Sequence, residues 1–260
     1  MTEAAGDGHR EFAGKVALVT GGAAGIGFAI ARAFARAGAS VALAGRTQDT
    51  LTHSAAAITD ESGAEAFAIR ADVGDPSDCE RMLAATVARF GALDILVNNA
   101  ALFAPIPLIE VGGDEALRAF IVNVVGPLSL ARAFAKWTIA RSRKGVIVNV
   151  SSIAAARPSP GLALYSASKA ALESLTRSMA LEWTRAGLRV NAVAPGHVNT
   201  EGVLEDFRAG RLDQKVITAH IPAGRIADVD DIAEAVMFLA SARARHIVGQ
   251  VLVVDGGEGF

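Results

Sequence analysis

The sequence predicts an α/β protein with a doubly wound parallel sheet of about seven strands and helices on both faces. Short apolar runs alternate with helical patterns along almost the whole chain, and 52% of its 260 residues are apolar, enough for a large core. No linker, repeat or low-complexity tract divides the chain. This alternation favours a parallel sheet, because right-handed crossovers place a helix between successive strands and leave one ligand crevice at their carboxyl ends.

The individual elements follow from apolar runs and from the residues that end them. Gly38 and Gly187 each follow a helical pattern and are expected to end it, and Pro76 is suited to a first helical turn. Apolar runs predict strands at residues 15–20, 40–44, 64–71, 94–98, 145–150, 188–194 and 250–254. Helical patterns cover residues 26–37, 49–61, 76–90, 114–141, 164–186 and 228–240.

Two segments depart from this regular pattern. Residues 197–221 mix glycine, charges and short apolar groups, which suits a mobile substrate lid better than a core element. The first residues are polar, acidic and glycine-containing, unlike a signal peptide. We therefore expect a mobile N-terminal arm at residues 1–13 and a single domain at residues 14–260 with a lid near 197–221.

The composition argues against several classes of protein. A formal net charge of −2 gives no support for nucleic-acid binding. Cys79 is the single cysteine, and the five histidines show no ligand spacing, so we expect no disulfide and no metal. No uncharged apolar run approaches the ~20 residues that span a bilayer. We expect a cytoplasmic protein without a membrane or nucleic-acid partner.

A glycine-rich turn follows the first expected strand and opens a helix. It contains Gly21, Gly25, Ile26 and Gly27 in the pattern G-x-x-x-G-x-G. Glycine lets the backbone approach a pyrophosphate closely, and the helix N-terminus supplies N–H donors and the positive end of a dipole. Such turns are common between a strand and a helix, but in the first βα unit of an alternating chain this one indicates a dinucleotide site.

The end of the second strand bears on the choice of nucleotide. An acidic residue there would bind a ribose 2′-hydroxyl, whereas an arginine would accept a 2′-phosphate. This chain has Arg46 in Ala44-Gly45-Arg46-Thr47, and a guanidinium pairs with phosphate bidentately. A solvated surface arginine is the structural alternative. The prediction is NADP(H) over NAD(H).

The only tyrosine lies four residues before a lysine on an expected helix. Tyr165 and Lys169 therefore share one helix face. A phenol ordinarily titrates near pH ~10, and a fixed cation nearby would lower that pKa toward the working range. The pair can then exchange a proton with a carbonyl or an alcohol. By spacing alone, a Tyr and a Lys on one helix more often mark the edge of a buried face.

These motifs together resemble the short-chain dehydrogenase/reductase family over residues 14–257. The resemblance rests on an ordered series: residues 20–27, Asp72-Val73, Asn98-Asn99-Ala100, Asn123, Ser151-Ser152, residues 165–169, Pro195-Gly196 and residues 254–257. It implies a Rossmann-type sheet. In one departure, Ala101 stands where the family usually has glycine after Asn-Asn-Ala, which would slightly crowd the nicotinamide side.

The resemblance implies a catalytic tetrad of Asn123, Ser152, Tyr165 and Lys169. Tyr165 would be the general acid in reduction and the general base in oxidation, and Lys169 would hold the nicotinamide ribose. Ser152, thirteen residues before Tyr165, would bind the substrate oxygen; its neighbour Ser151 is the weaker candidate. Asn123 would perturb its helix and anchor a water leading to Lys169. Without the resemblance it would be interpreted as a satisfied buried amide.

Further cofactor contacts are implied in the same way. Asp72 and Val73 would lie at the adenine, although an Asp at the end of a strand is also ordinary turn chemistry. Asn99 would line the adenosine ribose. Val198 and Thr200 would touch the nicotinamide carboxamide. His197 is interpreted as a loop residue, because the tetrad already supplies a proton donor.

The predicted function is that of an NADP(H)-dependent oxidoreductase, a carbonyl reductase that interconverts a ketone or aldehyde and a secondary alcohol. An NAD-dependent alcohol dehydrogenase and a 3-oxoacyl thioester reductase are alternatives within the family. Related epimerases are usually longer, and enoyl reductases have a longer Tyr-to-Lys spacing. A non-catalytic nicotinamide nucleotide sensor is the alternative of another class, and the complete tetrad argues against it. Apolar residues near the expected pocket favour a modest apolar or mixed substrate, and the family implies a homotetramer.

Overall fold

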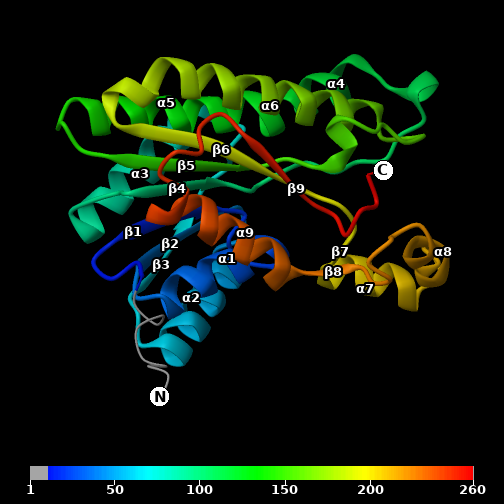
Figure 1. Ribbon diagram of the computed structural model, residues 1–260, viewed down its shortest axis with the longest axis horizontal. Helices are drawn as coiled ribbons and strands as arrows, with labels where there is room; N and C mark the ends of the chain where they lie inside the picture. The colour runs from blue at the N-terminus through cyan, green and yellow to red at the C-terminus, as the bar shows by residue number, and fades with distance from the viewer. Residues whose placement is uncertain (1–10, 260) are drawn as a thin grey trace.

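A computed structural model describes residues 11–259, in which one parallel sheet is covered by helices on both faces (Figure 1). The sheet strands are β1 (Val16–Thr20), β2 (Ser40–Gly45), β3 (Ala66–Arg70), β4 (Ile95–Asn98), β5 (Gly145–Val150), β6 (Leu188–Pro195) and β9 (Val251–Val254). One face carries α1 (Gly25–Arg36), α2 (Gln48–Ser62) and α9 (Val229–Ala240). The other carries α3 (Pro76–Phe90), α4 (Gly113–Phe120), α5 (Gly126–Ile139) and α6 (Ala163–Trp183). This confirms the predicted doubly wound Rossmann-type sheet.

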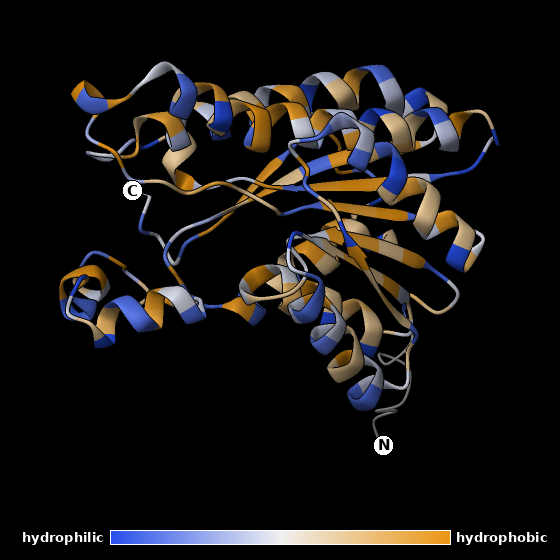
Figure 2. Cartoon of the chain, turned by 180° about the vertical axis from the view of Figure 1, so that it is seen from behind, coloured by the Kyte–Doolittle hydropathy of each residue, from blue (hydrophilic) through white to orange (hydrophobic). Residues whose placement is uncertain are grey.

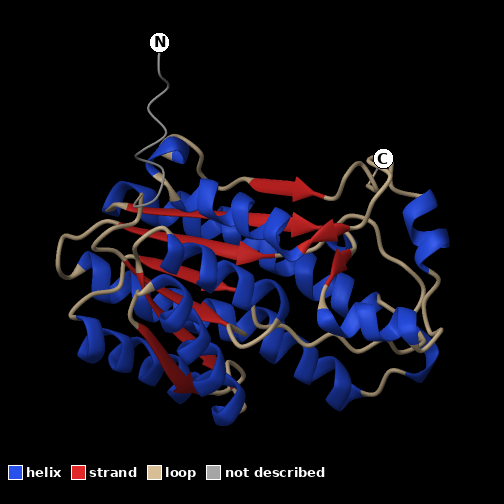
Figure 3. Ribbon diagram, turned by 90° about the horizontal axis from the view of Figure 1, so that it is seen from below, coloured by secondary structure: helices blue, strands red, loops and turns tan. Residues whose placement is uncertain are grey.

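The order of the strands places the ligand crevice. Across the sheet they run β3-β2-β1-β4-β5-β6-β9, and all six pairings are parallel. The order reverses between β1 and β4, since the chain winds outward from β1 in one direction and then crosses back to continue in the other. A crevice opens at such a switch point, outside the carboxyl ends of the strands. Figure 3 shows the strand arrows running toward the end of the molecule where the lid segment lies.

The two faces of the sheet have separate cores, because side chains alternate along each strand. In β1, Ala17 and Val19 pack with the α1, α2 and α9 side, whereas Val16 and Leu18 pack with the α3, α5 and α6 side. Both faces of the strand are buried, which is why the strands are continuous apolar runs rather than alternating ones. In Figure 2 the sheet strands are accordingly hydrophobic, while hydrophilic residues lie on the outer sides of the helices.

The segment expected to form a lid contains more regular structure than its sequence suggests. It holds β7 (Val198–Asn199), α7 (Glu201–Arg208) and α8 (Gln214–Ala219), and β7 pairs with β8 (Ala227–Asp228). Both helices are short and have no buried residues. They project from the body of the molecule near its C-terminus (Figure 1). The short length of these elements explains why periodicity did not reveal them.

The predicted N-terminal arm lies mostly outside the described residues. Among residues 11–13, Phe12 is 3% exposed and meets the ring of Phe34 edge-on at 5.1 Å between centroids, whereas Glu11 and Ala13 are exposed. The backbone N–H of Phe12 also donates to the carbonyl of Ala37. Phe12 therefore packs against α1, although the predicted arm includes it.

The long helix expected at residues 114–141 is continuous from Gly113 to Ile139 but is interrupted by a π-helical turn, Ile121–Val125. Its 27 residues are long and apolar enough, by length and composition alone, to cross a membrane. Its second half packs Leu130, Ala131 and Phe134 into the core. Covering the sheet therefore accounts for the apolar composition of this helix.

A substitution at Phe134 would show how much the core between α5 and the sheet contributes to the free energy of unfolding. Its ring is fully buried, and it lies so close to β5 that a Cβ on Gly145 would stand 2.8 Å from Cζ. We expect Phe134→Ala to lower the free energy of unfolding by about 3–5 kcal/mol, through lost burial and the cavity left behind. Denaturant unfolding would measure this, with Ile109→Ala, at a side chain 96% exposed, as the control. Equal effects of the two substitutions would contradict this view of the core.

Candidate active site

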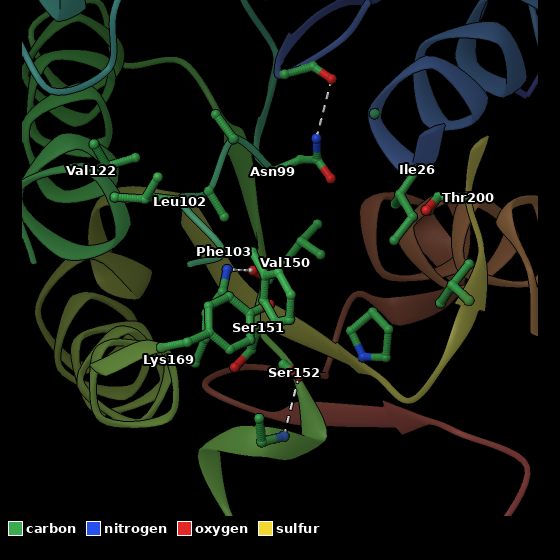
Figure 4. A pocket seen from close by; sticks show the side chains of 18 of the residues that line it. Ile26, Asn99, Leu102, Phe103, Val122, Val150, Ser151, Ser152, Lys169 and Thr200 are labelled. Carbon is green, nitrogen blue, oxygen red and sulfur yellow. Dashed lines mark hydrogen bonds between the residues drawn. The ribbon is translucent and has the colours of Figure 1, made fainter. Parts of the chain in front are cut away.

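A cleft of about 780 Å³ opens at the carboxyl ends of the strands, a size typical of small-molecule and cofactor sites (Figure 4). It extends from the glycine-rich turn after β1, past the ends of β2, β4, β5 and β6, to the lid. Twelve of the fourteen residues predicted for the site line it: Gly21, Ile26, Gly27, Arg46, Asp72, Val73, Asn99, Ser152, Tyr165, Lys169, Val198 and Thr200. The other two, Gly25 and Asn123, do not line it.

The glycine turn brings the start of α1 against the end of β1. A Cβ on Gly27 would stand 2.1 Å from the carbonyl oxygen of Gly21, so only glycine permits this approach. Gly21 and Gly25 have left-handed φ values of 64° and 52°. The N-cap residue Ala24 offers no side-chain cap, which leaves the first N–H groups of α1 available to a ligand. An exposed helix start lined by glycine fits the pyrophosphate of a dinucleotide.

Polar groups lock this turn to the neighbouring strand. Thr20 Oγ1 accepts hydrogen bonds from the backbone N–H groups of Asn99 (3.0 Å) and Ala100 (3.1 Å). In return, Asn99 Nδ2 donates to the carbonyl of Thr20 at 2.9 Å. The Asn99 side chain thus ties β1 to β4 as well as lining the cleft (Figure 4).

One end of the cleft carries a charged group of three residues: Arg46 after β2, Asp72 after β3, and Arg118 on α4. Asp72 accepts from the backbone N–H of Gly74 at 2.8 Å and from Arg118 Nη2 at 2.7 Å. Burial raises the pKa of Asp72, but these hydrogen bonds and the charges of Arg118 and Arg46 outweigh it, so the pKa lies below its ordinary value. Asp72 is therefore an anion with one oxygen held by Arg118, a partner that sequence reasoning missed.

The other side of the turn faces the lid. Thr200 Oγ1 accepts from the N–H of Val203 and so caps α7. A Cβ on Gly25 would meet Thr200 Cγ2 at 3.5 Å, so Gly25 lies against the first residues of the lid rather than in the cleft. Val198 is buried at 6% exposure and sits in β7 at the cleft wall. The fold therefore brings predicted residues of the glycine turn and of the lid to the same cleft.

Ser152 and Tyr165 form a hydrogen-bonded pair inside the cleft. Ser152 lies directly after β5 and caps a short helical turn, with Oγ accepting from the N–H of Ala154 at 3.2 Å. Tyr165 lies in the first turn of α6, and its ring meets Phe103 edge-on at 5.1 Å. Burial raises the pKa of Tyr165, and the hydrogen bond with Ser152 only partly offsets this.

Lys169 lies against the face of the tyrosine ring, with its ammonium 5.6 Å from the ring centre. The ammonium donates to the carbonyl of Val150 at 2.7 Å (Figure 4). Burial lowers the pKa of Lys169 to about 8, and the charge of Glu173 opposes that shift. The sequence predicted that this cation lowers the pKa of the phenol; burial instead raises it, so the predicted direction is wrong.

The adjacent serines have different partners. Ser151 Oγ donates to Glu173 Oε1 at 2.8 Å, so its hydroxyl is held by α6. Ser152 Oγ instead meets the phenol. This supports the choice of Ser152 over Ser151 as the group that faces a substrate.

Asn123 lies behind the cleft, in the π-helical turn. Its Oδ1 accepts from the N–H of Leu102 at 2.7 Å, while Nδ2 donates to the Leu102 carbonyl (3.0 Å) and to Ser168 Oγ (2.9 Å). The side chain is 1% exposed, and its amide ties the loop after β4 to α6. Asn123 thus holds Leu102 and the start of α6 in place, and its own side chain does not reach the cleft.

A histidine–glutamate pair on the cleft wall was missed by sequence reasoning. His197 Nδ1 lies 2.5 Å from Glu258 Oε1, and both residues line the cleft. The sequence alone predicts only a loop residue at His197 and gives no signal for Glu258. The two are 61 positions apart, so no local pattern links them.

Comparisons with known proteins agree over nearly the whole chain. The model of a family described as enoyl-(acyl carrier protein) reductase matches residues 21–258. A sorbitol dehydrogenase of Cereibacter sphaeroides is 41% identical, covering 94% of this chain and 97% of its own. A galactitol 2-dehydrogenase of Agrobacterium fabrum is 40% identical, with the same coverage of both chains. The crystal structure of levodione reductase superposes with a TM-score of 0.89 at 30% identity and covers 95% of this chain and 98% of that one.

The buried ammonium of Lys169 predicts a pH dependence of stability. Its folded pKa of about 8 lies below the ordinary 10.5, so between these values the unfolded chain binds more protons and the free energy of unfolding rises with pH. Relative to Lys169→Met, which does not titrate, we expect the nucleotide-free wild type to gain up to about 3 kcal/mol between about pH 7.5 and 10.5. Denaturant unfolding at several pH values would measure this. A constant difference between the two proteins would contradict the burial of a charged lysine.

Proposed function

The chain belongs to the short-chain dehydrogenase/reductase family, and on that premise we propose that it interconverts a ketone and a secondary alcohol with NADP(H), using Tyr165 as proton donor and acceptor. The observation that carries the proposal is the Ser152–Tyr165 pair over Lys169, inside the cleft at the strand switch point. Relatives named as sorbitol and galactitol dehydrogenases support a small hydroxylated substrate.

The two hydroxyl groups divide the work on the substrate oxygen. The nicotinamide nucleotide supplies or accepts the hydride. Ser152 hydrogen-bonds the carbonyl oxygen and stabilises the negative charge that develops on it. Tyr165 donates its proton to that oxygen in reduction and removes the proton in oxidation. A phenol whose pKa is raised by burial is protonated at neutral pH, which is the form that reduction requires.

Lys169 and Asn123 act on the geometry of this pair. Lys169 binds the nicotinamide ribose with the donors that Val150 leaves free, since an ammonium has three. Asn123 is a positioning residue, because its amide holds Leu102 in the cleft wall and fastens α6 at Ser168. The π-helical turn places the amide between these two segments.

Nucleotide binding is assigned to the glycine turn and to the charged end of the cleft. The open N–H groups of α1 take the pyrophosphate. Asp72 accepts from the adenine amino group with the capacity that Arg118 and Gly74 leave. Arg46 is exposed at the cleft and pairs with a 2′-phosphate, which supports NADP(H) over NAD(H).

The competing enoyl reductase activity, named in the description of the matching family model, fits the site less well. Tyr165 and Lys169 are four positions apart on one face of α6, and Ser152 is hydrogen-bonded to the phenol. This arrangement delivers a proton to a carbonyl oxygen. A 3-oxoacyl thioester reductase would use the same site and remains the second candidate, differing only in the group attached to the carbonyl.

A cytoplasmic homotetramer is proposed with the activity. The long helices α5 and α6 lie on one face and carry exposed apolar side chains, with Ile139 43% and Leu181 84% exposed. Pairing these helices between subunits would remove such side chains from water. Light scattering of the purified protein gives the mass of the assembly and tests this.

Removal of the phenol hydroxyl tests the proton donor. We expect Tyr165→Phe to lower kcat by about 10²–10⁴-fold, the usual contribution of a positioned acid or base, while the fold and nucleotide binding are kept. Absorbance of the reduced nicotinamide during ketone reduction measures the rate, and nucleotide fluorescence measures binding. Activity near that of the wild type would exclude the mechanism.

The nucleotide preference rests on one guanidinium. Losing a charge-assisted hydrogen bond costs about 1.5–3 kcal/mol, so we expect Arg46→Ala to raise the KM for NADP(H) roughly ten- to hundredfold and to change that for NAD(H) little. Steady-state kinetics with both nucleotides measure the ratio. The control is Arg36→Ala, because Arg36 pairs with Glu61 on the surface and does not line the cleft. An unchanged preference in Arg46→Ala would mean that NADP(H) had been assigned wrongly.

A further inference from the structure

The His197–Glu258 pair is polar, faces the cleft and has no part in the proton transfer described above. The Glu258 carboxylate contacts His197 twice: Oε1 lies 2.5 Å from Nδ1, and Oε2 accepts from the backbone N–H at 3.0 Å. The Glu258 side chain is 13% exposed, whereas that of His197 is 44% exposed. The carboxylate is thus largely enclosed, and the imidazole is the more exposed member of a pair that lines the cleft.

The local backbone is shaped to allow this contact. A Cβ on Gly196 would stand 2.6 Å from Glu258 Oε2, so a side chain there would displace the carboxylate. After β9, Gly256 and Gly257 take left-handed φ values of 64° and 88°. Asp255 then accepts from the N–H of Gly257 at 2.9 Å and of Gly259 at 2.7 Å. These bonds fold the C-terminal segment back so that Glu258 points under His197.

We propose that His197, oriented by Glu258, binds a second hydroxyl group of the substrate, adjacent to the carbon that is oxidised or reduced. A carboxylate at Nδ1 favours the tautomer with the proton on that nitrogen, which leaves Nε2 as a hydrogen-bond acceptor. A substrate hydroxyl is a donor that suits such an acceptor. The inference rests on the proposed function and adds to it a substrate class, vicinal diols and hydroxyketones.

The rest of the wall makes this pair selective. The cleft is lined by the apolar side chains of Phe103, Leu162 and Val203, and its other lining residues include the polar Arg157 and Ser159. A hydroxyl placed against apolar atoms alone would lose its hydrogen bonds to water without replacement. A hydroxyl placed against His197 keeps one, and a substrate that lacks it leaves the imidazole nitrogen unpaired. The site therefore favours the hydroxylated compound over its deoxy counterpart.

A purely structural role is the competing explanation, since the same contacts fasten the C-terminal segment to the start of the lid. The carbonyl of His197 also accepts from the N–H of Ala227, which joins it to β8. A structural pin and a substrate contact differ in their consequences. Loss of a structural contact lowers the stability of the protein and lowers kcat/KM for all substrates alike. Loss of a substrate contact changes the ratio of kcat/KM between substrates.

The experiment uses two ketones that differ by one hydroxyl, 3-hydroxy-2-butanone and 2-butanone, with the full-length protein and each nucleotide. The quantity compared is the ratio of their kcat/KM values. We expect wild type to favour the hydroxyketone and His197→Phe, which keeps a planar ring without nitrogens, to reduce the ratio roughly tenfold. Glu258→Ala, which frees the ring, should reduce it by a smaller factor. His53→Phe, at an exposed position on α2, is the matched control.

The possible results distinguish a wrong substrate contact at His197 from a wrong assignment of the oxidoreductase activity. Thermal unfolding of each variant shows whether the fold is kept. An unchanged ratio in His197→Phe, or an equal loss on both ketones, overturns the inference and leaves the proposed oxidoreductase standing. If the wild type reduces neither ketone with either nucleotide, the proposed function is overturned, and this inference with it.

Discussion

The close approach of α1 to the end of β1 is the constraint on which the site depends. Gly27 sits so near Gly21 that any side chain would strike the Gly21 carbonyl, and the approach leaves the first N–H groups of α1 facing the cleft. Thr20 and Asn99 hold the turn against β4, at the strand switch point. The same bonds thus fasten the turn to the sheet and hold the first turn of α1 at the cleft.

At the other end of the cleft, titratable groups are placed where they lower the stability of the fold. Lys169 is buried and donates a hydrogen bond to the Val150 carbonyl, and the half-buried Tyr165 has a raised pKa. A protein selected for stability alone would place apolar residues at both positions. The buried ammonium lies against the face of a phenol that is protonated at neutral pH, and both residues line the cleft. This is the pattern expected of a functional site, where strongly perturbed titratable groups face a cleft.

Most of the fold and much of the site could be predicted from the sequence, because both rest on local patterns. Buried strands give continuous apolar runs, and the glycine turn and the Tyr165–Lys169 pair are each encoded within a few residues. The helices α7 and α8 were missed because they are short and bury no residues. Arg118 was missed because its contact with Asp72 spans 46 positions. The predicted direction of the Tyr165 pKa shift was wrong because burial, which no spacing reveals, raises that pKa.

The same distinction between local patterns and long-range contacts separates the proposed chemistry of this cleft from its choice of substrate. The residues proposed to handle nucleotide and proton lie at strand ends, where the backbone ladder fixes them, and on the adjoining helix α6. The residues proposed to meet the rest of the substrate come from the lid and the C-terminal segment, which are joined by long-range contacts such as His197 with Glu258 and Ala223 with Gly256. Loops of this kind can change without disturbing the sheet. Specificity therefore depends on side chains distant in sequence, and a structure is needed to find them.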